Sequence, residues 1–275
     1  MAFRKRREAL RSILSAAGCA RPGSVYDAAS IRIAADLGFE LGMFGGSVAS
    51  LAVLGDPDIA LITLTELSEQ MRRMSRASAL PVLVDADHGY GNAMNVRRTI
   101  EELETAGAAG LTIEDTLLPQ AFGQSATQLI SLDEGVGKMK AALEARGDPS
   151  LVVIGRTGAA SITSLDDAIA RAKAYEAAGV DALFFTGIKN RGELEAISAA
   201  TRLPIVLGGA LAPPSAPKAS LLRRGSMAPP TPNALSIARR EYFSFKAFMA
   251  IFLQRRGSGN GTCARLPPLR ADCAR

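Results

Sequence analysis

Short apolar runs alternate with longer amphipathic segments over the first three quarters of the chain. The runs are four to six residues long and rich in β-branched residues, whereas the segments between them repeat apolar residues at helical spacing. The pattern predicts strands at Ser24–Ala28, Phe39–Phe44, Leu80–Asp85, Gly110–Glu114, Leu151–Arg156, Asp181–Thr186 and Pro204–Leu207. It predicts helices at Arg4–Ala17, Ser30–Leu37, Asp58–Arg76, Asn95–Ala106, Asp133–Arg146, Ser164–Ala178 and Glu193–Ala200.

The regular succession of strand and helix predicts the fold class. Units of about 25 to 35 residues, each a strand followed by a helix, indicate parallel strands joined by crossover helices. Seven such units suit a TIM-type (β/α)8 barrel better than an open sheet, and a doubly wound sheet is the alternative. We expect residues 1–210 to form the body of the barrel.

The alternation stops near Ala210, and the rest of the chain has a different composition. Eight of the fourteen prolines follow this point, and those of residues 213–232 exclude a regular helix or strand there. Leu235–Ile237 is a candidate last strand and Tyr242–Leu253 a candidate helix, whereas residues 257–275 look disordered. We therefore expect residues 211–275 to be an atypical Pro- and Arg-rich tail that replaces the last barrel unit, leaving the C-terminal part irregular or incomplete.

Charge is divided unevenly between these two parts. Residues 211–275 hold eleven Lys and Arg against Glu241 and Asp272, so the net charge of +5 divides into +9 there and −4 over residues 1–210. An acidic body gives no support for nucleic-acid binding. A basic tail that serves as an interaction segment is a weaker alternative.

Composition excludes several other classes of protein. No apolar run is long enough for a membrane span, and no apolar core follows the basic residues 4–7 as in an export signal. Cys19, Cys263 and Cys273 have neither metal-binding spacing nor an even count for disulfides, so we expect a cytoplasmic protein. With one histidine, a His-rich zinc site and a Ser-His-Asp triad are both disfavoured.

The candidate chemistry lies at the ends of two neighbouring predicted strands. Asp85 and Asp87 follow Val82–Val84, and side chains two residues apart in an extended segment point the same way. Glu114 ends the next strand, one strand-helix unit later. Clustered carboxylates repel one another unless a cation lies between them, and Mg²⁺, or alternatively Mn²⁺, prefers such oxygen ligands. Three acids at adjoining strand ends therefore predict a metal site.

Simpler interpretations exist for each residue near these acids. Asp85 to Gly91 could be a polar turn in which Asp87 caps the next helix, and Asp58 could likewise be a cap or a gating residue. His88 is a candidate acid but a lone histidine is more often structural, and Tyr90 could order the loop or bind a ligand. Arg156 would alone be an ion-pair partner, but beside three carboxylates at a strand end we expect it to bind substrate.

The segments Asp85–Asn92 and Ile113–Asp115 resemble the isocitrate lyase/phosphoenolpyruvate mutase superfamily. Phe44–Ser50, Leu61–Thr63 and Gly155–Thr157 strengthen the match, which covers residues 8–210 and is closest to the Mg²⁺-dependent oxaloacetate decarboxylase branch. The resemblance implies a TIM-type barrel that associates into dimers or tetramers and acts on a small keto acid.

The resemblance also implies a role for individual residues. Asp85 would bind Mg²⁺ directly, and Asp87 and Glu114 would hold it through waters. Gly46 and Ser47, with their backbone N–H groups, would bind the keto acid end of the substrate, and Arg156 would bind its carboxylate.

At three places the sequence differs from the pattern of the superfamily, and these differences limit the reactions that the resemblance implies. The loop Pro119–Gln124 has no cysteine where the lyases of isocitrate and methylisocitrate carry one, and Gly158 replaces the usual Asn or Asp. Arg239 occupies the position of a substrate-binding histidine of the decarboxylases. Because the surrounding tail is unlike the family, we hypothesise that it derives partly from a shifted reading frame, which the nucleotide sequence would test.

These residues predict Mg²⁺-dependent decarboxylation of oxaloacetate to pyruvate and CO₂. A metal that polarises the ketone supplies an electron sink, and loss of CO₂ needs no general base, which fits a loop without cysteine. The alternatives are a lyase or hydrolase acting on another small 2-keto or 2-hydroxy acid, or an inactive homologue with a disrupted C-terminus.

Overall fold

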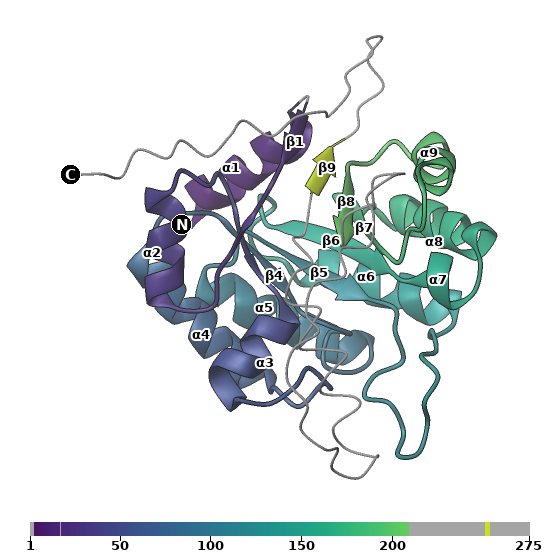
Figure 1. The fold of residues 1–275 in the computed structure, drawn as a ribbon, viewed down its shortest axis with the longest axis horizontal. Coiled ribbons are helices and arrows are strands. Elements are labelled where there is room, and N and C mark those ends of the chain that lie inside the picture. Colours follow the sequence, from purple (N-terminus) through teal and green to yellow (C-terminus); the bar gives the residue numbers. More distant parts are fainter. Residues whose placement is uncertain (1–2, 17, 209–250, 254–275) are drawn as a thin grey trace, which may run out of the picture.

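Seven parallel strands form the central sheet of the protein, in the order in which they follow one another along the chain. The computed structural model describes residues 3–16, 18–208 and 251–253 (Figure 1). The strands are β2 (Gly23–Ser24), β3 (Gly42–Phe44), β4 (Val82–Asp85), β5 (Gly110–Glu114), β6 (Val152–Thr157), β7 (Ala182–Thr186) and β8 (Ile205–Gly208). Sequential order excludes the doubly wound alternative, in which the strand order reverses. The fold is an α/β, TIM-like partial barrel.

Helices follow most strands and cover the outer side of the sheet (Figure 1). Side-chain caps set many of their starts: Thr63 and Glu66 form a reciprocal capping box before one helix, and Asn92 caps the next. Gly107, with φ 96°, ends that second helix in the left-handed conformation. The helices are α1 (Arg4–Ser15), α2 (Ala28–Asp36), α3 (Gly46–Leu54), α4 (Leu64–Ala77), α5 (Ala93–Ala106), α6 (Leu132–Ala145), α7 (Ala159–Ile162), α8 (Leu165–Ala178) and α9 (Arg191–Ala200).

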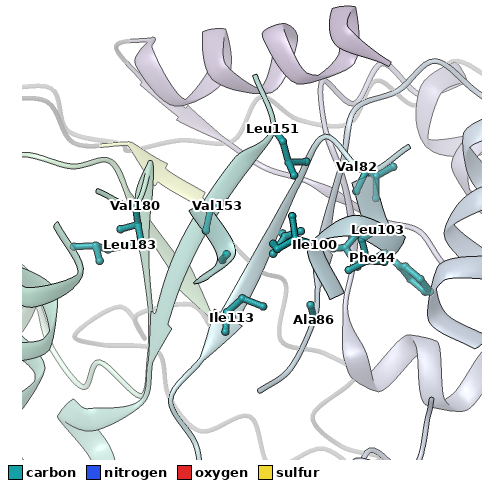
Figure 2. Close-up of a cluster of buried hydrophobic side chains, with 14 of the residues drawn as sticks. Phe44, Val82, Ala86, Ile100, Leu103, Ile113, Leu151, Val153, Val180 and Leu183 are labelled. Carbon is teal, nitrogen blue, oxygen red and sulfur yellow. The ribbon is translucent and has the colours of Figure 1, made fainter. Parts of the chain in front are cut away.

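Alternation along each strand divides the apolar side chains into two cores. Val82, Ile113 and Leu183 belong to the larger cluster between the sheet and the helices, which Figure 2 shows. The intervening residues face the inside of the curve and form a second cluster: Leu41, Met43, Leu83, Ala109, Val152, Ile154, Ala182, Phe184 and Val206. Because parallel strands covered on both faces need apolar residues on each, they appear in the sequence as continuous apolar runs.

Helix α1 closes one end of the inner core. Leu10 and Leu14 pack into the inner cluster from this helix. Arg7, only 5% exposed, donates to Asp148 at 2.8 Å and to the Glu104 carbonyl at 2.7 Å. The expected amphipathic first helix is therefore confirmed, and its buried arginine ties it to the loops at this end of the sheet.

Several boundaries expected from the sequence are wrong. The strand expected at Ser24–Ala28 ends at Ser24, because the Asp27 side chain caps α2. The long helix expected from Asp58 begins only at Leu64, after the Thr63 cap. The sequence pattern also missed α3 and α7, since an apolar helix such as α3 lacks the amphipathic spacing used to identify helices.

The tail contributes one described segment. β9 (Ile251–Leu253) pairs antiparallel with β1 (Gly18–Ala20) and lies beside β8 (Figure 1). The helix expected at Tyr242–Leu253 is therefore wrong at its end, where pairing with another strand determines the conformation. The other expectations for the tail, including a strand at Leu235–Ile237 and disorder over residues 257–275, lie outside the described residues. None of the helices described combines the length and the hydropathy that a membrane span requires.

Candidate active site

The pairing of the parallel strands places Asp85, Glu114 and Arg156 on one face of the sheet, at the ends of their strands. Asp85 pairs with Thr112 across β4 and β5, and Glu114, two residues further along, pairs with Arg156 of β6. Residues two apart on a strand share a face, so these side chains continue the inner row of apolar residues beyond its edge. The period of the strands thus brings the two acids and the arginine together.

Arg156 joins two of the acids directly. Its Nη1 lies 2.6 Å from both carboxylate oxygens of Asp85, and its Nη2 lies 3.1 Å from Oε2 of Glu114. The guanidinium also lies over the ring of Phe184, 5.3 Å from its centroid. Thr112 donates to Oδ1 of Asp85 at 3.1 Å. These contacts hold Asp85, Glu114 and Arg156 as one unit.

Asp87 lies next to Asp85, to whose Oδ1 its N–H donates at 3.3 Å, and next to the start of α3. A Cβ added to Gly46 would lie 2.7 Å from Oδ1 of Asp87 and 3.3 Å from Oδ2 of Asp58. Asp58 therefore contributes a further carboxylate to the rim, in addition to the three predicted acids. The sequence could not decide between a cap and a gating role for Asp58, because its neighbours come from separate loops.

The segment that carries Asp87 has an unusual backbone. Asp87 and Tyr90 have φ of 45° and 63°, and Gly89 and Gly91 are also left-handed, at 78° and 145°. Such angles are rare for residues other than glycine and occur mainly where the surrounding structure imposes them. The Tyr90 hydroxyl and the Nδ1 of His88 are buried without a hydrogen-bond partner, so the segment directs polar atoms into the protein.

The concentrated charge shifts the pKa values of the site residues. Burial, and then the charges of Asp85, Asp58 and Glu114, raise the pKa of Asp87 well above its ordinary value. Burial also raises the pKa of Glu114. Burial lowers the pKa of His88 to about 4, so this histidine is neutral at neutral pH. Four neighbouring carboxyl groups, those of Asp58, Asp85, Asp87 and Glu114, share the positive charge of Arg156. A further cation bound here would stabilise their ionised forms.

The candidate ligands of this site are all carboxylate oxygens, which limits the kind of metal ion that they suit. Within the described residues, no three acidic, histidine or cysteine side chains converge closely enough to enclose a metal ion. Mg²⁺ usually keeps several waters and takes only one or two protein carboxylates, so the all-oxygen group of Asp85, Asp87 and Glu114 fits a largely hydrated Mg²⁺.

The other predicted substrate-binding residues are Gly46, Ser47 and Arg239. Gly46 is buried beside Asp87, whereas Ser47 lies in the first turn of α3 with an exposed side chain. Arg239 lies outside the described residues. Sequence reasoning gave no role to Lys138, which is buried in α6 and contacts the segment of Asp87. A lysine at a core-facing position of a helix was the available signal.

Gly46 provides a first test of the site. We expect Gly46→Ala to lower kcat/KM about a hundredfold, since displacement of a site group by about 1 Å can have such an effect. The fold should be retained, because alanine is the most favourable helix residue. Steady-state kinetics and thermal melts measure both. The matched control is Gly137→Ala in α6, where an added Cβ meets nothing within 4 Å. Equal kinetics for the two variants would contradict the proposed proximity of Gly46 and Asp87.

Comparison with known proteins places this site in context. A relative in Bradyrhizobium diazoefficiens named oxaloacetate decarboxylase is 83% identical over 210 residues, which is 76% of this chain and 73% of the relative. A 2,3-dimethylmalate lyase of the phosphoenolpyruvate mutase/isocitrate lyase superfamily is 30% identical, with a TM-score of 0.67 over 75% of this chain and 71% of that one. A phosphonopyruvate hydrolase, solved with oxalate and Mg²⁺, is 29% identical, with a TM-score of 0.66 over 74% and 71% of the two chains.

The family profile covers the same body. The profile described as phosphoenolpyruvate phosphomutase matches residues 10–225, which include every described strand of the parallel sheet and all the acids of the rim. Because of this match and of its sequence identity to these relatives, the chain belongs to the phosphoenolpyruvate mutase/isocitrate lyase superfamily.

Proposed function

We propose that the protein decarboxylates oxaloacetate to pyruvate and CO₂ in a Mg²⁺-dependent reaction. The observation that carries this proposal is the unit of Asp85, Glu114 and Arg156 at the strand ends, in a chain that is 83% identical over 210 residues to an oxaloacetate decarboxylase. Asp85 would bind the metal directly, and Asp87 and Glu114 would bind its waters. When bound, Mg²⁺ supplies Lewis acidity that stabilises negative charge on the keto oxygen.

Arg156 is the residue we assign to the substrate carboxylate. A guanidinium can make two parallel hydrogen bonds to a carboxylate, which both holds and orients it. Phe184 packs against the guanidinium, and Asp85 and Glu114 hold its position. Substrate would therefore meet a positively charged group whose orientation is set before binding.

The start of α3 is suited to the other end of the substrate. Gly45, the N-cap residue, provides no side-chain hydrogen bond, so the first N–H groups of the helix are not capped in this way. Helix N-termini attract anions through such N–H groups. We assign the backbone N–H groups of Gly46 and Ser47 to the keto acid end. Gly46 lies so close to Asp87 that a Cβ at this position would contact the Asp87 carboxylate.

The chemistry requires few groups from the protein. The electron pair of the broken C–C bond passes to the adjacent keto group and forms the enolate of pyruvate, and a proton then returns to carbon. No base has to remove a proton first, in agreement with a loop Pro119–Gln124 that has no cysteine.

Removal of the metal tests this function. We expect purified full-length protein to release pyruvate from oxaloacetate with Mg²⁺, and we expect EDTA to reduce the rate by about a thousandfold, as loss of several kcal/mol of charge stabilisation implies. Coupled detection of pyruvate measures the rate against the spontaneous reaction, and excess Mg²⁺ should restore it. Equal rates with EDTA and with Mg²⁺ would rule out the metal dependence.

The same assay separates the alternatives. A panel of 2-keto and 2-hydroxy acids, among them 2,3-dimethylmalate and phosphonopyruvate, distinguishes decarboxylation from the lyase and hydrolase reactions named for the structural neighbours. A cooperative melt without turnover of any substrate would identify an inactive homologue. The expected dimer or tetramer, and the tail at residues 211–275 as replacement of a barrel unit, stay predictions.

A further inference from the structure

Each backbone carbonyl of the segment from Ala86 to Gly89 accepts a hydrogen bond, and three of the four donors come from other parts of the fold. Within the segment, the Gly89 N–H donates to Ala86 O at 2.9 Å. From β5, the Glu114 N–H donates to Asp87 O at 2.8 Å. From α5, Thr99 Oγ1 donates to Gly89 O at 3.0 Å. The fourth donor is a side chain of α6.

This fourth donor is Lys138, whose Nζ lies 2.9 Å from His88 O. Lys138 is only 3% exposed and lies in α6 between core positions. Burial lowers the pKa of this ammonium, and the charges of Glu134, Asp115 and Glu114 act in the opposite direction. A buried ammonium is unfavourable unless its partners compensate for lost hydration, so its contact with one carbonyl of the acidic segment calls for a role.

We propose that Lys138 is a positioning residue that holds the segment of Asp87 in the conformation that binds the metal. The proposal rests on the metal site assigned above. Lys138 touches neither the substrate nor the reacting atoms, and it acts through the peptide unit between His88 and Gly89.

The backbone angles explain why the segment needs such a contact. Asp87 and Tyr90 have left-handed conformations that a chain leaves when nothing holds it. Without the ammonium, the His88 carbonyl would be buried without this donor. Rotation of its peptide unit to find another donor would change the backbone angles of His88 and Gly89, which lie between Asp87 and Tyr90. Groups that orient a ligand residue in this way typically change metal affinity when they are replaced.

The test uses four variants of the full-length chain. Lys138→Met keeps the length of the side chain but removes the donor, and Lys138→Arg keeps a donor and the charge. Thr99→Val removes the donor to the next carbonyl at nearly constant volume. Lys140→Met, on the exposed side of the same helix, is the matched control.

Two measurements separate positioning from general stability. Calorimetric titration with Mg²⁺ should give a dissociation constant at least about tenfold higher for Lys138→Met than for wild type, with Lys138→Arg within about threefold and Lys140→Met unchanged. Hydrogen exchange in EDTA should be faster in Lys138→Met over residues 85–91, while β7 and α8 keep the wild-type rates. Thr99→Val should change both in the same direction, to a smaller extent.

The results of these measurements either support or overturn the positioning role of Lys138. A Lys138→Met protein that binds Mg²⁺ within twofold of wild type, or exchanges residues 85–91 at the wild-type rate, overturns it. If Lys138→Met gives no cooperative melt, Thr99→Val is judged by the same two criteria. A wild-type protein that does not bind Mg²⁺ refutes the proposed metal site instead, and exchange over residues 85–91 then decides alone whether Lys138 holds the segment.

Discussion

Replacement of Asp85 by asparagine is expected to lower kcat/KM for oxaloacetate by about a thousandfold or more, the effect of losing roughly 4 kcal/mol of charge stabilisation. The fold should be retained, because Asp85→Asn keeps the shape of the side chain and an oxygen for the Thr112 hydroxyl. The substitution removes a negative charge. The proposed direct metal ligand becomes neutral, and among the described residues Arg156 retains Glu114 as its ion-pair partner. Both effects act on the step that needs a stabilised keto oxygen.

The measurement is steady-state kinetics with saturating Mg²⁺, together with the Mg²⁺ dependence of the rate. Asp36→Asn, at the exposed end of α2, removes the same charge far from the strand ends and should leave kcat/KM within about twofold, as is usual for a surface position. An Asp85→Asn protein with more than a tenth of the wild-type kcat/KM would refute the assignment of Asp85 as the metal ligand.

The largest effect on stability is expected at the opposite end of the barrel, from Arg7→Met. Arg7 pairs with Asp148 at 2.8 Å and with Glu104 at 3.3 Å, and its Nε donates to Ala108 O at 3.2 Å. Removing one partner of a buried ion pair leaves the remaining charge uncompensated and costs about 3–5 kcal/mol. For a protein of this size we expect the melting temperature to fall by about 10 °C.

Thermal melts followed by circular dichroism measure this effect, and Lys5→Met, exposed on the same helix, should melt within about a degree of wild type. At temperatures well below the melt, Arg7→Met should retain near wild-type kcat, because α1 lies away from the acids of the rim. A variant with an unchanged melt would show that Arg7 does not anchor α1. Loss of kcat in a fully folded variant would contradict a purely structural role.

The period of the chain by itself predicted the fold class and the end of the sheet at which the candidate site residues lie. Strands separated by one helix each indicate a parallel sheet, in which the acids that end two strands lie at the same edge. Glu114 and Arg156 follow from this rule alone, since each closes its predicted strand. The helix start at Ser164 was likewise visible in the sequence, because an N-cap depends on residues within one helical turn.

Only the tertiary structure decided contacts between segments that are distant in the chain. At Ile251–Leu253, the end of the helix expected from the sequence, pairing of β9 with β1 gives a strand instead, since a partner strand can outweigh local preference. Asp58 and Asp87 come from separate loops, and only the folded structure places both carboxylates beside Gly46 at the start of α3. Lys138 lies 50 residues from His88 in the chain, and no local sequence pattern predicts a hydrogen bond between residues so far apart. Periodicity describes which face a side chain takes, whereas its partner depends on how the faces pack.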